Sequence, residues 1–410
     1  MTVLIGEPIT LGSGLTLPNR LAKAAMAENL ADENLLPTDE LKSAYKTWAN
    51  GGWGLIITGN VQVDPRHLGQ ARDIANNDAT DRVRLLNSWK EWASASKSEG
   101  TPTVVQISHP GRQSPAGAGT RGFFEKTLAP SAVPLRLGKG LFSAVVSALL
   151  FGTPRAMTIA EILDVQDRFV KTAVLAAEAG FDGIELHAAH GYLLSQFLTS
   201  ATNKRTDQYG VTPAGRAKFV VDTIKAIRAA VPSGFTVGIK FNSVDHQSSL
   251  ALEECVEQLQ LITQAGLDFL EISGGSYEEP IGIVDPEKVK AKKESTIARE
   301  AFFLDFATVI RDKFPGLPLL VTGGFRTRKT IDSALASGAL DLVGIARPAV
   351  LNPSAPTNTL LEEGNSNARV TVASIKIPWL LNKIGNYVIG AGYETAWYVS
   401  KIKTLASGAY

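Results

Sequence analysis

The segment AGFDGIELH, residues 179–187, decides the fold of this 410-residue chain. Gly180 ends a helical pattern, because glycine is the preferred residue just past a helix C-terminus. The apolar run that begins at Asp182 is typical of a strand buried on both faces of a parallel sheet. The same pattern returns as AGLDFLEIS at 265–273 and, more loosely, as SGALD at 337–341. A repeated unit of helix, short loop and buried strand indicates an α/β protein.

Eight strand-like runs occur at intervals that suit alternating strands and helices. The clearest helical pattern between them is Thr158–Ala179, where Thr158 and Glu161 have the spacing of a capping box. No GxGxxG motif follows the first run, which disfavours an open dinucleotide-binding sheet. We therefore predict a (β/α)8 TIM barrel. The runs are Leu21–Met26, Gly54–Asn60, Thr103–Ser108, Asp182–His187, Phe235–Asn242, Asp268–Ser273, Pro318–Gly323 and Asp341–Ala346.

Segments outside the repeats complete the predicted organisation. Residues 9–17 predict an N-terminal hairpin that closes the bottom of the barrel. Long inserts follow the third and sixth strands, at about 109–157 and 274–294, and barrel enzymes build their sites from such loops. We assign 1–355 to the barrel domain and 356–410 to a C-terminal extension. The aromatic residues of the extension predict that it packs on the barrel or on a partner subunit, as in a homodimer.

Composition narrows the class of function. The 41 basic and 40 acidic residues nearly cancel, so no nucleic-acid partner is expected. The single cysteine, Cys255, excludes an internal disulfide or a cysteine-ligated cluster. The first twenty residues lack the pattern of a signal peptide. The apolar run LFSAVVSALLFG, 141–152, falls short of the ~20 residues of a membrane span and predicts a packed lid or loop helix. We expect a cytoplasmic protein without a membrane span.

The fourth strand ends in HAAHGYLLSQF, residues 187–197. The C-terminal ends of barrel strands form the active-site face, which places His187, His190 and Tyr192 there. Two neutral imidazoles can each donate one N–H to a single carbonyl or phenolate oxygen. A phenol close by can supply a proton. This pattern predicts polarisation and protonation of a conjugated carbonyl substrate.

Two other interpretations of the histidine pair stay open at this point. The pair could bind a metal in a barrel hydrolase, or it could be structural. A zinc site needs a third ligand. The remaining histidines, His67, His109 and His246, show no ligand-like spacing, so metal is disfavoured and none is predicted.

Three further strands carry polar side chains. Asn60 and Gln106 each carry a donor and an acceptor, and Lys240 carries a cation. Such groups can read the edge of a flat heteroaromatic ring and stabilise negative charge on it.

The last two strands end in glycines and arginine. The loops after strands seven and eight form the usual phosphate site of a barrel. Gly323 and Gly324 allow close backbone approach, and Arg347 can bind phosphate bidentately. A phosphorylated flat cofactor facing a carbonyl-binding histidine pair is a description that FMN fits well.

Three motifs resemble the Old Yellow Enzyme family of FMN-dependent NAD(P)H oxidoreductases, over roughly residues 3–355. They are LPNRL at 17–21, HPGRQ at 109–113 and, most specifically, HAAHGYLLSQFLTSATNKRTDQYG at 187–210. The chain is also similar to the barrel part of 2,4-dienoyl-CoA reductases, although the single cysteine argues against their iron–sulfur cluster.

The resemblance implies a role for each candidate residue. His187 and His190 would bind the substrate carbonyl, and Tyr192 would protonate the α-carbon. Non-covalent FMN would be held by a larger set: Ala25, Met26 and Ala27 beside the ring, Asn60 and Gln106 at its edge, Lys240 near N1 and O2, and Gly323, Gly324, Ala346 and Arg347 at the phosphate. The family often has Thr or Cys where this chain has Ala27, so one hydrogen bond to the flavin would be missing here.

The resemblance therefore implies an ene-reductase. NADPH or NADH would reduce the flavin in a ping-pong cycle, and the C=C bond of a small-molecule α,β-unsaturated carbonyl compound would then be reduced. The alternatives are the metal-dependent hydrolase and a catalytically silent flavin-binding protein.

Overall fold

The computed structural model describes residues 4–122, 124–137, 141–242, 249–273, 292–362, 364–365, 367–373, 375 and 387–407. His246 and most of the predicted insert after the sixth strand lie outside these residues.

Eight parallel strands close into a barrel, and each of the eight predicted runs holds one of them. The ring closes because the last strand pairs with the first, with Ile345 opposite Lys23. The (β/α)8 prediction is confirmed. In order round the barrel the strands are β3 (Leu21–Lys23), β4 (Leu55–Ile57), β6 (Thr103–Ser108), β9 (Gly183–Ala188), β10 (Thr236–Asn242), β11 (Phe269–Ser273), β12 (Leu319–Thr322) and β13 (Leu342–Ile345).

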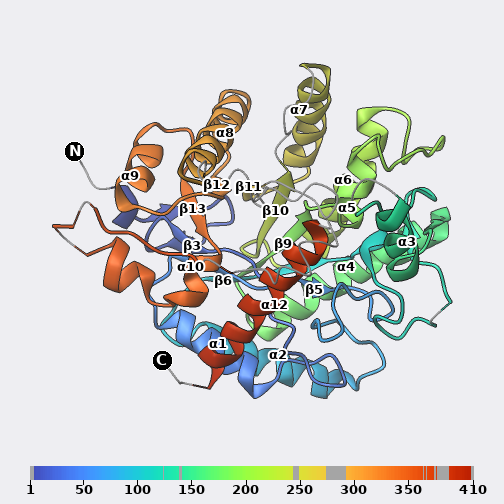
Figure 1. The fold of residues 1–410 in the computed structure, drawn as a ribbon, viewed down its shortest axis with the longest axis horizontal. Coiled ribbons are helices and arrows are strands. Elements are labelled where there is room, and N and C mark those ends of the chain that lie inside the picture. The colour runs from blue at the N-terminus through green and yellow to red at the C-terminus, as the bar shows by residue number, and fades with distance from the viewer. Residues whose placement is uncertain are drawn as a thin grey trace.

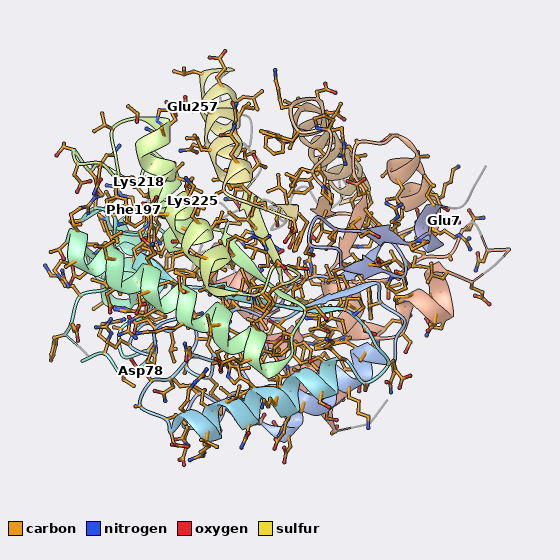
Figure 2. The ribbon with its side chains drawn as sticks, turned by 180° about the vertical axis from the view of Figure 1, so that it is seen from behind. Glu7, Asp78, Phe197, Lys218, Lys225 and Glu257 are labelled. Carbon is orange, nitrogen blue, oxygen red and sulfur yellow. The ribbon has the colours of Figure 1, made fainter. Side chains whose placement is uncertain are left out.

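Helices surround the barrel (Figure 1). From behind, α6, which carries Lys218 and Lys225, lies against α4 (Figure 2). The helices that follow the strands are α1 (Asp39–Ala49), α2 (Arg82–Ser96), α4 (Ile159–Ala179), α6 (Pro213–Ala230), α7 (Ser249–Gln264), α8 (Lys292–Lys313), α9 (Arg328–Ala336) and α10 (Arg347–Leu351).

The N-terminus of α4 has the local structure that its sequence predicts. Thr158 Oγ1 accepts the backbone N–H of Glu161, and the Glu161 carboxylate accepts that of Thr158. This is a complete capping box. At the other end Gly180 adopts φ +93°, a left-handed conformation that costs glycine little. Both signals come from residues inside one helix, so they do not depend on the rest of the fold.

The predicted hairpin closes the end of the barrel opposite the carboxyl ends of the strands. Its strands are β1 (Ile9–Thr10) and β2 (Thr16–Leu17), which pair antiparallel. Leu11 and Leu17 are buried against apolar side chains that point into the barrel, and fully burying each such side chain stabilises the fold by about 1.5–3 kcal/mol. The inward side chains in this cluster are Ala22, Leu55, Ile57, Val104, Phe269, Leu320 and Leu342.

The insert after β6 contains short elements. Gly111–Gln113 forms a 3-10 turn, and β7 (Leu128–Ala129) pairs with β8 (Arg155–Ala156). The predicted apolar helix is present as α3 (Leu141–Leu150), but it is only partly packed. Leu149 is 73% exposed, although Ser147 is buried. No helix in the described parts of the chain is long and apolar enough to cross a membrane.

The C-terminal helix α12 (Tyr387–Ala406) lies along α1 and α10 (Figure 1). Ser43 Oγ on α1 donates to the carbonyl of Ala406 at 2.8 Å, and Glu394 forms an ion pair with Arg347 on α10. A turn of π-helix at Pro356–Leu360 lies between α10 and α12 in the sequence. Two short elements complete the chain: β5 (Val61–Gln62), which pairs with β6, and α5 (Leu193–Leu198).

Candidate active site

The predicted site residues lie in the strands of the barrel or just after them. Lys240 on β10 is opposite His187 on β9 and Glu271 on β11. Gln106 on β6 is opposite Glu185 on β9. Because all eight strands are parallel, their carboxyl ends meet at one face of the barrel, and the side chains predicted for the site come from that face.

The turn after β9 is built on two left-handed residues. His190 has φ +55° and Gly191 has φ +76°. A non-glycine residue rarely adopts this conformation, so its neighbours must hold it. The backbone N–H of His190 donates to Asn242 Oδ1 at 3.0 Å, and its Nε2 lies 3.1 Å from Ser273 Oγ. The ends of β10 and β11 therefore fix the His190 side chain.

The turn brings both histidines and the tyrosine together. The ring centroids of His187 lie 5.1 Å from those of His190 and 4.5 Å from Tyr192. His187 Nδ1 accepts the backbone N–H of Ala189 at 3.3 Å, so the neutral ring carries its proton on Nε2. Nε2–H is then the group that His187 can offer to a substrate oxygen.

Both rings are neutral at physiological pH. Burial lowers the pKa of His187 well below its usual value, and His190 and Lys240 lower it further. Burial, followed by Lys240, lowers the pKa of His190 to about 3. The two rings can therefore donate hydrogen bonds to a carbonyl oxygen while they stay uncharged.

A residue that sequence reasoning missed holds this turn in place. The Gln196 side-chain amide donates to the carbonyls of Pro110 and Gly191, and its oxygen accepts the N–H of Arg112. A Cβ on Gly111 would lie 2.5 Å from this amide, so only glycine fits there. Gln196 therefore links the HPGRQ and HAAHGYLLSQF motifs. Its position within the second motif was the one sequence signal that could have identified it.

The polar residues predicted to contact the flavin edge are each held by a buried glutamate. Gln106 Nε2 donates to Glu185 Oε1 at 2.7 Å, and Lys240 Nζ donates to Glu271 Oε1 at 2.5 Å. All four side chains are buried. Sequence reasoning chose Gln106 and Lys240 but missed the two glutamates, which sit within apolar strand patterns.

Asn60 is held by a buried carboxyl. Its amide donates to Asp73 Oδ2 at 3.3 Å, and Gln62 Nε2 donates to the same oxygen at 2.8 Å. Burial raises the pKa of Asp73 to about 7 against the hydrogen bonds that it accepts. A Cβ on Gly69 would lie 3.1 Å from Asp73 Oδ2 and 3.5 Å from the Tyr192 hydroxyl, so this loop approaches the predicted proton donor.

The residues predicted to bind the phosphate follow β12 and β13. Gly323 and Gly324 have φ values of +152° and +82°. A Cβ on Gly323 would meet Phe303 at 2.5 Å, so the backbone approaches its surroundings more closely than any other residue would permit. Ala346 precedes α10, and Arg347 Nη1 lies 2.6 Å from Glu394. One guanidinium N–H is thus engaged, and an arginine has five.

The residues predicted to lie beside the flavin ring also follow a strand of the barrel. Ala25, Met26 and Ala27 follow β3 and are half-buried. The Met26 carbonyl would lie 2.3 Å from a Cβ on Gly59, so the ends of β3 and β4 are in close contact. Ala27 offers no polar atom, as its sequence requires. Glycines and an arginine after β12 and β13, amide and ammonium donors from β4, β6 and β10, and half-buried apolar residues after β3 fit the phosphate, ring edge and ring face of FMN.

A second histidine cluster lies in the described structure, contrary to expectation from spacing. Asp64, His67 and His109 place ligand atoms within 4.8 Å of one another. His67 Nδ1 accepts from Arg121 and His109 Nδ1 accepts a backbone N–H, so each neutral ring carries its proton on Nε2, where a metal would bind. Both Asp64 oxygens accept from Arg66. These hydrogen bonds favour a structural role.

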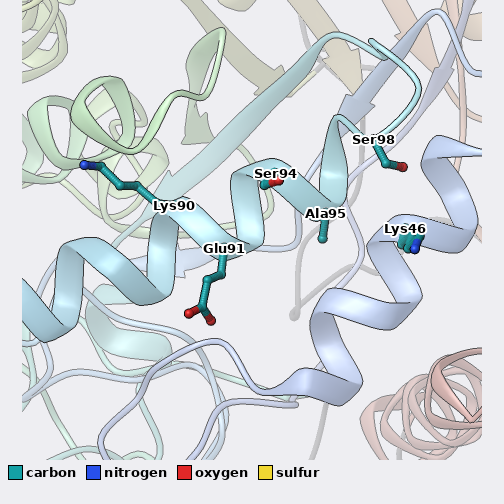
Figure 3. A pocket seen from close by; sticks show the side chains of 6 residues that line it. All are labelled: Lys46, Lys90, Glu91, Ser94, Ala95 and Ser98. Carbon is teal, nitrogen blue, oxygen red and sulfur yellow. The ribbon is translucent and has the colours of Figure 1, made fainter.

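A hollow of about 530 Å³ between α1 and α2 contains none of the predicted site residues (Figure 3). Its lining is mostly charged or hydroxyl-bearing and solvent-exposed. The lining residues are Lys46, Lys90, Glu91, Ser94, Ala95 and Ser98.

Comparison with known proteins gives one consistent result. The family model of the NADH:flavin oxidoreductase / NADH oxidase family matches residues 5–362. The NADH-dependent flavin oxidoreductase iliE of Neonectria sp. is 50% identical over 96% of this chain, which spans 53% of that protein. The iliE protein of Hypocrea jecorina is 47% identical over 92% of this chain and 94% of its own length. The solved structure of morphinone reductase matches this chain with a TM-score of 0.70 and 25% sequence identity. The match covers 87% of this chain and 89% of the morphinone reductase chain.

Proposed function

Because this chain belongs to the NADH:flavin oxidoreductase / NADH oxidase family, we propose that it reduces the C=C bond of α,β-unsaturated carbonyl compounds with electrons from NADH. Membership makes it an FMN-dependent oxidoreductase and confirms the resemblance found in its motifs. The relatives named above support NADH over NADPH as the hydride donor.

One observation carries the proposal. Two neutral imidazoles and a phenol lie on a single turn at the end of β9, with His187 presenting Nε2–H. Two N–H donors on one carbonyl oxygen draw electron density out of the conjugated double bond, which makes its β-carbon electrophilic. In this proposal Tyr192 delivers a proton to the α-carbon as negative charge develops there.

The remaining side chains would hold the cofactor. Gln106 and Asn60 would contact the isoalloxazine edge, Lys240 would face N1 and O2, and Arg347 would bind the phosphate. When bound, FMN would supply the hydride-transfer chemistry that links NADH to the substrate. The chain's own contribution is to orient the enone, polarise its carbonyl and supply the proton.

The test is an anaerobic titration of the FMN-loaded protein. We expect NADH to bleach the yellow flavin absorption, and stoichiometric 2-cyclohexenone or a maleimide to restore it. Cyclohexanone, which has the carbonyl but no C=C bond, should leave the flavin reduced. Restored absorption with both ketones, or with neither, would contradict the proposal. Absence of bleaching by either NADH or NADPH would favour a catalytically silent flavoprotein.

A further inference from the structure

Two buried carboxyl groups lie behind the residues proposed to contact the flavin. Glu185 accepts from Gln106 at 2.7 Å, and Glu271 accepts from Lys240 at 2.5 Å. Glu185 and Glu271 are 0% exposed, and Gln106 and Lys240 are at most 3% exposed. Glutamate is almost never fully buried without a partner, so the charge of both groups must be accounted for.

The two carboxyl groups also interact with each other. The charge of Glu271 acts on Glu185, and Oε2 of each is buried without a hydrogen-bond partner among the described residues. Among the described residues, only Glu271 has a cation as a hydrogen-bond partner, whereas Glu185 accepts from a neutral amide. A buried carboxylate without a counter-charge is strongly disfavoured, so one of the two carboxyl groups should carry a proton. Glu271 also holds the ammonium of Lys240, which favours its charged form. The proton therefore belongs on Glu185.

The surrounding charges support this assignment. Burial, and then Glu271, raise the pKa of Glu185 well above its usual value. Burial also pushes the pKa of Glu271 upward, but Lys240 and hydrogen bonds bring it below its usual value. His187 on β9 and His190 in the turn after it are neutral. Lys23 on β3 acts on Lys240 but has its own counter-charge in Glu28. One lysine and one carboxylate then balance locally.

We propose that Glu185 and Glu271 share a single proton, carried by Glu185, and act as positioning residues for Gln106 and Lys240. The inference rests on the flavin placement proposed above. Because one N–H of Gln106 is donated to Glu185, the amide is held in one orientation, with its carbonyl oxygen and its second N–H left to bond the flavin edge. Because Glu271 partly neutralises Lys240, it sets how much of that positive charge stabilises the reduced flavin.

The substitutions E185Q and E271Q separate this model from one in which both glutamates are ionised. Replacing a protonated Glu185 with Gln changes no charge, so the midpoint potential of bound FMN should match the wild-type value between pH 6 and 9. E271Q removes a negative charge beside Lys240 and should shift the potential upward. E254Q, which removes the carboxylate that pairs with Arg216 on the outer helices, is the matched control and should leave it unchanged. An upward shift in E185Q comparable to that in E271Q would overturn the proposal.

A second measurement needs neither the flavin nor a stable E271Q protein. In the infrared spectrum of the flavin-free wild-type protein at pH 8, a protonated carboxylic acid gives a C=O band that carboxylates lack. We expect this band to be present in wild type and E254Q and to disappear in E185Q. A band unaffected by E185Q, or no band in wild type, would overturn the shared proton. Neither result depends on enone reduction, so failure of the proposed activity would remain distinguishable.

Discussion

At the scale of single residues, the conformation of His190 explains how one short motif forms a site. Its left-handed backbone turns the chain so that His190 and Tyr192 both face His187. The strain of that conformation is offset by hydrogen bonds from the ends of two other strands. The motif therefore needs the barrel around it to adopt the proposed catalytic geometry.

Replacing Tyr192 with Phe removes only the hydroxyl. We expect reoxidation of the reduced flavin by 2-cyclohexenone to slow by about 10²–10⁴-fold, which is the usual contribution of a positioned general acid. Reduction by NADH should keep its wild-type rate, as followed by stopped-flow absorbance. Tyr209, a buried tyrosine that contacts Phe197, gives the control Y209F. Reoxidation of Y192F at the wild-type rate would show that the proton comes from elsewhere.

At the scale of elements, α4 shows which parts of a barrel helix are locally determined. Its capping box and glycine C-cap involve only residues at its own ends. Its apolar stripe, by contrast, is meaningful only because the barrel lies beneath it, where Ile162, Val165 and Phe169 are fully buried. Local signals thus set where the helix begins and ends, and packing supplies most of its stability.

The substitution T158A tests the capping box. The Thr158 side chain satisfies the otherwise unpaired N–H of Glu161, so its loss should reduce the free energy of unfolding by about 1 kcal/mol. Chemical denaturation of the flavin-loaded protein measures this change. T158S keeps the hydroxyl and should stay close to wild type. If T158A and T158S unfold at the same denaturant concentration, the cap does not contribute.

At the scale of the whole molecule, buried titratable groups with opposite pKa shifts balance one another. The pKa of His190 is lowered to about 3, so its contribution is present above its unfolded pKa of about 6.5 and is lost as pH falls below that value. The pKa of Asp73 is raised to about 7, so its contribution is present below its unfolded pKa of about 3.9 and is lost as pH rises towards 7. Between pH 4 and 6.5 the two effects oppose each other.

Single substitutions should reveal the two halves of this balance. H190N removes the histidine while keeping a residue that tolerates positive φ, and it should make stability fall less steeply on acidification from pH 6.5 to 4.5. D73N should make it fall more steeply. Each change in slope is expected to be at most about 1.4 kcal/mol per pH unit, the value for one proton. Urea unfolding at several pH values measures the slopes, and a shift of both variants in the same direction would contradict the assignment.

The sequence alone was enough to predict the strand count, the barrel, the hairpin and the cap of α4, because these depend on patterns within a few residues. It also placed His187, His190, Gln106 and Lys240 at one face, since the ends of parallel strands meet there. It did not find Glu185 or Glu271, because a charged residue inside an apolar strand looks like an exception until its partner is known.

Tertiary structure alone decided the protonation states of the site residues and the pairing of side chains that lie far apart in the sequence. Glu185 lies 86 residues from Glu271, and Arg347 lies 47 residues from Glu394, so no local pattern could pair them. Burial keeps His187 neutral, and the hydrogen bond from the Ala189 N–H to Nδ1 leaves its proton on Nε2. Protonation depends on distance and solvent exclusion, which exist only in the folded chain, whereas the order of strands and helices is already present in the spacing of apolar residues.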